Sequence, residues 1–202
     1  HDRLAGVFKT LVQIDSVSRN EAAVAKALQE IFESLGGEVL FDDAGSKIGG
    51  DTGNLIARFK GSGPDVEPLL LNAHMDTVQP GEGVKILFSD GTFTSDGSTI
   101  LGADDKSAVA IIIETLRVLQ EENHPYGPLE VVITACEEVG LLGAKNLDYS
   151  LITARYGYSI DATDTHGVVT QAPAANHIQF KIHGRDAHAG AAPEKGSMRS
   201  RW

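Results

Sequence analysis

The sequence has a single cysteine, Cys136, among its 202 residues, which excludes an intrachain disulfide. A chain without disulfides is compatible with a reducing compartment, and we expect a cytoplasmic protein. No apolar stretch approaches the roughly 20 residues that a membrane-spanning helix needs, so we expect no membrane contact. Basic residues are also few, and the formal net charge of −11 argues against nucleic acid as a partner. The acidic surplus suits either an acidic cleft that concentrates cations or plain solubility.

Hydrophobic residues make up 42% of the chain, enough for one core of ordinary size. Apolar residues recur at helical spacing over residues 3–14, 24–35 and 104–121. Short apolar runs typical of strands cover residues 39–41, 54–59, 69–74, 129–135 and 156–160, and a hairpin is expected over 84–95. This alternation predicts an α/β fold with a mixed or parallel sheet and helices on its faces.

Other segments carry weaker local signals. Ser18-Arg19-Asn20-Glu21 has the form of a capping box at a helix start, and the glycine-rich residues 45–53 are interpreted as a turn. Residues 139–146 predict a short helix. Residues 177–183 alternate strictly and predict the first strand of a second, antiparallel unit. Residues 197–202 follow neither period, so no element is predicted there.

Ionisable side chains follow three of the predicted strands. His74 ends one apolar run and Asp76 follows it, whereas Glu137-Glu138 and Asp161 come after two other runs. Asp104-Asp105 opens a predicted helix. Ligands of open α/β sheets bind beyond the carboxyl ends of the strands, so these groups are expected to converge. One imidazole and several carboxylates indicate a metal site, where a nearby free carboxylate could act as a general base.

The same residues also have ordinary structural explanations. His74 could be a core histidine, Asp104 or Asp105 could cap the helix, and Glu137-Glu138 could be a solvated acidic turn. The position of these groups directly after buried strands favours function. Cys136 has no evident histidine partner, which argues against a cysteine nucleophile.

Four segments stand in the order and spacing of a known family: NAHMDTV at 72–78, LGADDKSAVA at 101–110, CEEVG at 136–140 and YSIDA at 158–162. On these motifs the chain resembles the co-catalytic di-zinc exopeptidases, of the peptidase T (tripeptide aminopeptidase) type. The resemblance covers roughly residues 4–196. It implies a three-layer α/β/α catalytic domain with a mixed, mainly parallel sheet over residues 1–168. Residues 169–202 would begin an α+β lid or dimerisation domain.

The resemblance implies that two zinc ions are held side by side. His74, Asp104 and Asp161 would bind the first ion. Asp104 would bridge to the second ion, which Glu138 would also bind. Cobalt or manganese could take the place of zinc. The family's further metal-binding histidine lies near the end of a longer chain and has no counterpart here, so we expect truncation in or after the lid.

The resemblance also implies the chemistry. A hydroxide bridging the two zinc ions would hydrolyse short peptides, with Glu137 as the general base and Asp76 orienting His74. His188 would contact the substrate, and the lid would pair two subunits into a homodimer. Two alternatives stay open: a deacylase or carboxypeptidase with the same metal chemistry, and a non-catalytic metal-binding fragment.

Overall fold

The computed structural model describes residues 2–63, 66–162, 166–171, 183–185 and 197–199. The chain divides into two compact units, His1–Thr163 and Asp164–Trp202. That the second unit begins a lid or dimerisation domain stays a prediction. Within the described residues, no helix combines the length and the apolar composition needed to cross a bilayer.

The first unit contains the predicted helices and strands, with small shifts at their ends. Its helices are α1 Asp2–Val12, α2 Ala22–Ser34, α3 Ala44–Ile48, α4 Ala103–Glu121, α5 Leu142–Lys145 and the 3-10 helix η1 Tyr149–Leu151. Its strands are β1 Glu38–Phe41, β2 Leu55–Phe59, β3 Leu69–His74, β4 Ile86–Ser89, β5 Thr92–Ser95, β6 Leu129–Thr134 and β7 Tyr156–Ser159. The expected hairpin over 84–95 is confirmed, because β4 and β5 pair antiparallel.

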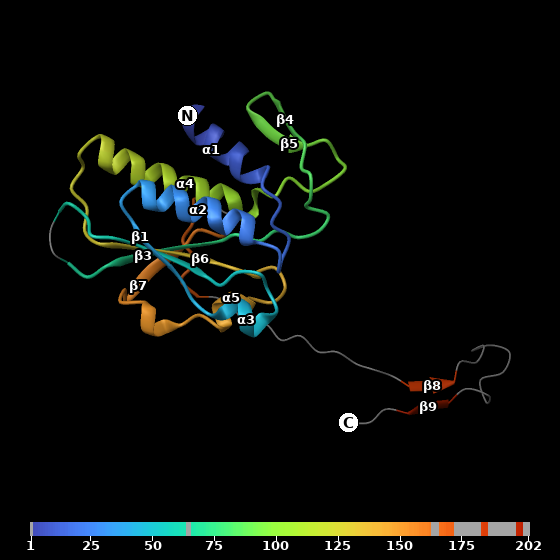
Figure 1. Cartoon of the computed structure of the whole chain (residues 1–202). Coiled ribbons are helices and arrows are strands. Elements are labelled where there is room, and N and C mark those ends of the chain that lie inside the picture. Colours follow the sequence, from blue (N-terminus) through green and yellow to red (C-terminus); the bar gives the residue numbers. More distant parts are fainter. Residues whose placement is uncertain (1, 64–65, 163–165, 172–182, 186–196, 200–202) are drawn as a thin grey trace. The chain divides into compact units, whose positions relative to one another are not determined.

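The main sheet has the strand order β1-β2-β6-β3-β7. β3 pairs in parallel with both β6 and β7, whereas β2 pairs antiparallel with β1 and with β6. Among the strands of this sheet, β2 therefore runs against the others, which confirms a mixed, mainly parallel sheet. Figure 1 shows α1, α2 and α4 on one face of the sheet and α3 and α5 on the other, so the predicted three layers are present.

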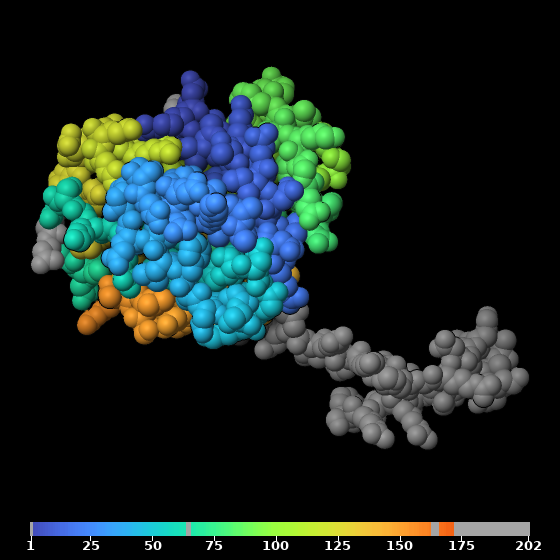
Figure 2. Space-filling view, viewed as in Figure 1, coloured from blue at the N-terminus to red at the C-terminus, as the bar shows by residue number. Residues whose placement is uncertain are grey.

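The core lies between the sheet and the helices α1, α2 and α4. Its largest fully buried side chains include Leu11, Leu28, Phe32, Ile112, Leu116 and Ile133. Figure 2 shows α1 and α2 in blue and α4 in yellow-green side by side on the visible surface of the molecule. Each such side chain contributes about 1.5–3 kcal/mol by leaving water. Because β3, β6 and β7 run in parallel within this packed frame, their carboxyl ends meet at one edge of the sheet.

The start of α2 differs from the predicted capping box. The hydroxyl of Ser18 donates to Asp76 instead, at 2.6 Å, and the side chain of Glu21 is fully buried. The cap comes from Asp51, whose Oδ1 accepts hydrogen bonds from the N–H groups of Glu21 and Ala22 at 2.8 and 3.0 Å. Because Asp51 lies 30 positions after Glu21, the local pattern could not reveal this cap.

Three further segments depart from the sequence expectations. The stretch 45–53, interpreted as a turn, includes most of the short helix α3, and the helix predicted over 139–146 is confined to α5. In the second unit, β8 His183–Arg185 pairs antiparallel with β9 Ser197–Arg199, where no element was predicted. A strand of three residues is too short to show an alternating sequence pattern. It is identified by its hydrogen bonds to the partner strand. Residues 177–182 of the predicted strand lie outside the described residues.

Candidate metal and active site

His74 is the last residue of β3, and its ring is 2% exposed. Nδ1 lies 2.9 Å from the carbonyl oxygen of Asp76 and 3.3 Å from the carboxylate Oδ1 of the same residue. A proton on Nδ1 would be donated there, leaving the lone pair of Nε2 for another partner. Nε2 lies 3.2 Å from Oδ1 of Asp104. The ring is therefore oriented as metal-binding histidines are, with one nitrogen fixed and the other directed into the site.

Asp76 is completely buried and connects two of the loops that form the site. Its carboxylate accepts hydrogen bonds from the Ser18 hydroxyl at 2.6 Å and from the N–H groups of Glu137 and Glu138 at 2.8 and 3.1 Å. Burial alone would raise the pKa of Asp76, but hydrogen bonds from His74, Ser18 and the Glu137 backbone hold it below its usual value. Asp76 is thus a fixed anion that holds the His74 ring and the Glu137-Glu138 backbone together.

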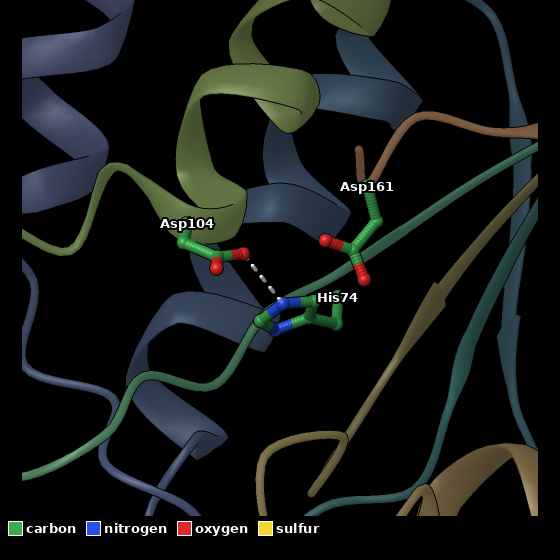
Figure 3. Close-up of side chains that lie close together, drawn as sticks. All are labelled: His74, Asp104 and Asp161. Carbon is green, nitrogen blue, oxygen red and sulfur yellow. Dashed lines mark hydrogen bonds and ion pairs between the residues drawn. The ribbon is translucent and has the colours of Figure 1, made fainter. Parts of the chain in front are cut away.

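The two aspartates at the start of α4 point in different directions. Neither Asp104 (φ −80°, ψ 108°) nor Asp105 (φ −117°, ψ 23°) has helical dihedrals. The side chain of Asp104 is 71% exposed and faces His74, as Figure 3 shows. The carboxylate of Asp105 is buried, accepts the His74 backbone N–H at 3.1 Å, and has its pKa raised by burial to about 7. This geometry favours Asp104 as the ligand and gives Asp105 a structural role.

Two groups of ligand atoms form around His74. In the first, His74, Asp104 and Asp161 each offer an atom within 4.8 Å of the others, and Figure 3 shows these side chains converging. In the second, His74, Glu137 and Glu138 meet the same limit. The predicted pairing of Glu138 with Asp104 around a second ion stays a prediction. The chain thus brings five of the predicted residues to the edge where β3, β6 and β7 end.

The electrostatics of this cluster favour a cation. Burial raises the pKa values of Glu137, Glu138 and Asp161; His74 opposes this shift, and neighbouring carboxylates reinforce it. Burial would lower the pKa of His74, but Asp76 and the other carboxylates raise it to about 10. The same carboxylates would attract a divalent ion, which competes with a proton for Nε2. An imidazole with several carboxylates is a donor set that fits zinc, and also cobalt or manganese.

Sequence reasoning missed the residues that support the site from behind. The local sequence pattern predicts that Ser18 and Glu21 cap a helix, yet the Ser18 hydroxyl donates to Asp76 and Glu21 accepts the Cys136 N–H. Asn54, directly before β2, accepts the N–H of Ala135. No motif in the sequence links these residues to the loops they hold. His188, the predicted substrate-binding residue, lies outside the described residues.

A cavity of about 680 Å³ lies elsewhere, at the edge of the sheet where β3 and β6 begin. Its lining includes Arg58, Tyr126 and Glu130 but none of the candidate site residues. The candidate site is therefore distinct from this cavity.

The fold and the site define a metallopeptidase-like α/β domain, and the chain belongs to peptidase family M28, whose sequence model matches residues 54–175. It is 45% identical over 195 residues to the uncharacterized protein YqjE of Bacillus subtilis (strain 168), covering 96% of this chain and 52% of that protein.

Two crystal structures resemble the chain over the same extent. One is the aminopeptidase PepT of Bacillus cereus ATCC 10987, 41% identical with a TM-score of 0.79. The other is a tripeptidase of Staphylococcus aureus, 37% identical with a TM-score of 0.80. Each match covers 96% of this chain and 52% of the other, so the chain spans about half the length of these relatives. The predicted resemblance to the peptidase T type and the predicted fold are confirmed.

Proposed function

We propose that the full-length protein is a zinc-dependent exopeptidase of the peptidase T type, acting on short peptides. The observation that carries this proposal is the convergence of His74, Asp104, Asp161 and Glu137-Glu138 at one edge of the sheet. The names of two relatives, an aminopeptidase and a tripeptidase, support the reaction class. Pairing of subunits through the lid and a cytoplasmic location stay predictions.

In this proposal, His74, Asp104 and Asp161 would hold one metal ion, and Asp104 with Glu138 would hold a second. When bound, the metal supplies Lewis-acid chemistry and makes water more acidic. The buried carboxylates of Asp76 and Asp105 hold the His74 ring and the His74 backbone in place.

Glu137 is the proposed general base. Its Oε2 lies 3.9 Å from Nε2 of His74, and its side chain is 24% exposed, so a water molecule and a peptide can reach it. Burial raises the pKa of Glu137, which favours accepting a proton from water at a carboxylate oxygen. The carboxyl group would then return that proton to the leaving amine.

The test is Glu137→Gln in the full-length zinc protein, with Glu30→Gln on the exposed side of α2 as a matched control. We expect kcat for a tripeptide to fall by about 10²–10⁴-fold in Glu137→Gln, because the amide cannot take up a proton. Bound zinc, measured by elemental analysis, should be unchanged, and Glu30→Gln should match the wild type. Full activity of Glu137→Gln would refute the assigned base.

A substrate panel separates this proposal from the alternatives. The wild-type protein should cleave unblocked tripeptides faster than N-acyl amino acids or carboxypeptidase substrates. A preference for either of the latter would assign the same metal chemistry to a deacylase or a carboxypeptidase. A zinc-loaded full-length protein that cleaves none of them would support a non-catalytic metal-binding role.

A further inference from the structure

The segment that carries Glu137 and Glu138 is held by a run of buried side chains. β6 ends at Thr134, and each of the next four backbone N–H groups donates to a side chain from another part of the chain. The donor and acceptor atoms are Ala135 N to Asn54 Oδ1 at 3.1 Å, Cys136 N to Glu21 Oε1 at 2.9 Å, Glu137 N to Asp76 Oδ1 at 2.8 Å and Glu138 N to Asp76 Oδ2 at 3.1 Å. We call these three acceptor residues the amide cradle.

Within the amide cradle, Glu21 holds the residue at which the chain turns. Cys136 has a φ of 50°, in the left-handed region that residues with a Cβ atom disfavour. Oε1 of Glu21 accepts the Cys136 N–H and also lies 3.2 Å from its Sγ. Such a conformation persists only where its surroundings enforce it. The direction in which Glu137 leaves the strand therefore depends on the Glu21 contact.

The burial of Glu21 is not explained by its place at the start of α2. The helix is capped by Asp51, and the side chain of Glu21 makes no capping hydrogen bond. Its carboxyl group is 0% exposed, and among the described residues Oε2 has no hydrogen-bond partner. Burying a carboxyl group in this way costs stability, so an apolar residue would serve the core better. The backbone of Arg19 and the Cys136 N–H both favour the charged form of this carboxyl group, and an apolar residue could supply neither contact. Of the two, only the contact with Cys136 reaches the segment that carries Glu137 and Glu138.

We propose that Glu21 is a positioning residue for Glu137 and Glu138, fixing the direction in which both carboxylates enter the site by holding Cys136. The catalytic and metal-binding roles of Glu137 and Glu138 rest on the proposed function. The contact between Glu21 and Cys136 does not depend on it.

The kinetic test compares Glu21→Ala and Glu21→Gln in the full-length zinc protein. In Glu21→Ala we expect kcat for a tripeptide to fall about 10- to 100-fold, because a misplaced base slows the reaction. KM should stay within about twofold, since ground-state binding is not removed. Glu21→Gln should recover most of kcat, because its amide oxygen can accept the Cys136 N–H in the position of Oε1.

Leu28→Ala is the control for a general loss of packing. Leu28 is fully buried in α2 and takes part in none of the hydrogen bonds of the amide cradle, so its truncation leaves a cavity without removing any of them. The folded Leu28→Ala protein should keep the wild-type kcat although it is less stable. If its kcat falls as far as that of Glu21→Ala, Glu21 is merely structural and the proposal is overturned. If Glu21→Ala does not fold, Glu21→Asp carries the same expectation, because the shorter side chain withdraws the acceptor from Cys136.

Hydrogen exchange of the metal-free protein gives a readout independent of activity. In Glu21→Ala, the amides of residues 136–138 should exchange about tenfold faster, the effect of losing one net hydrogen bond, while amides within β6 stay protected. Unchanged exchange would overturn the proposal. A wild-type protein that neither binds zinc nor cleaves peptides would refute the proposed function, but the exchange experiment would still decide whether Glu21 holds this segment.

Discussion

Asparagine in place of Asp76 would test how the site is held, because it keeps the shape of the side chain and changes only which atoms accept hydrogen bonds. Oδ1 of Asp76 accepts the Glu137 N–H, and Oδ2 accepts the Ser18 hydroxyl and the Glu138 N–H. An amide group has one oxygen, so in either orientation its NH₂ faces one of these two backbone N–H groups. The Ser18 hydroxyl can rotate, but a backbone N–H cannot.

The magnitude follows from these contacts. A buried N–H left without an acceptor costs about 1–3 kcal/mol. The remaining hydrogen bonds lose the contribution of the charge, roughly 1 kcal/mol more. We therefore expect Asp76→Asn to lower the free energy of unfolding by about 2–4 kcal/mol, a large part of the roughly 5–15 kcal/mol typical of a domain. kcat should fall as well, because the His74 ring and Glu137 lose their common support.

The assay is urea denaturation of the metal-free full-length protein, so that weaker metal binding does not contribute. Asp51→Asn is the matched control, because a single oxygen, Oδ1, accepts both the Glu21 and the Ala22 N–H and an amide oxygen can replace it. Asp51→Asn should lower the free energy of unfolding by less than about 1 kcal/mol, because it removes only the favourable effect of a negative charge at a helix start. If Asp76→Asn and Asp51→Asn lower the free energy of unfolding by the same small amount, the inferred role of the two Asp76 oxygens is wrong.

Two further predictions concern packing and metal removal. Gly143→Ala should lower the free energy of unfolding by about 1–3 kcal/mol, because the added Cβ would overlap the carbonyl oxygen of Ala135 and lie 2.5 Å from Oδ1 of Asn54. In Gly6→Ala, in α1, the added Cβ would have no atom within 4 Å, so this change should raise the free energy of unfolding by about 1 kcal/mol. A higher Tm for Gly143→Ala than for Gly6→Ala would contradict this account. Chelation should lower the Tm of the full-length protein and zinc should restore it, because binding to the folded state stabilises it. His74→Ala should abolish that zinc-dependent shift, and a shift of wild-type size in this variant would exclude His74 as a ligand.

The sequence predicted the elements that position the candidate site. The apolar run at 69–74 is long enough to identify a buried strand, and the change from apolar residues to His74 marks its end. The runs at 129–135 and 156–160 place Glu137 and Asp161 at strand ends in the same way. Parallel pairing then brings these ends together, so the location of the site follows from the order of strands and helices.

The supporting contacts could not be predicted, because they join residues far apart along the chain. Glu21 and Cys136 are 115 positions apart, and Ser18 and Asp76 are 58 apart. The local pattern of Ser18 to Glu21 fits a capping box, yet both side chains make stronger contacts elsewhere once the loops around Asp76 and Cys136 are in place. Tertiary packing overrides a local preference worth about 1 kcal/mol.

The sequence by itself determined which side chains reach the carboxyl edge of the sheet, because hydrophobic periodicity and strand ends are local properties of the chain. Only the tertiary structure decided which atoms face one another there. It turned Asp104 toward His74 and Asp105 into the core, and it placed Glu21 behind Cys136. The physical reason is that backbone dihedrals such as the positive φ of Cys136 are set by the surrounding contacts rather than by the residue that adopts them.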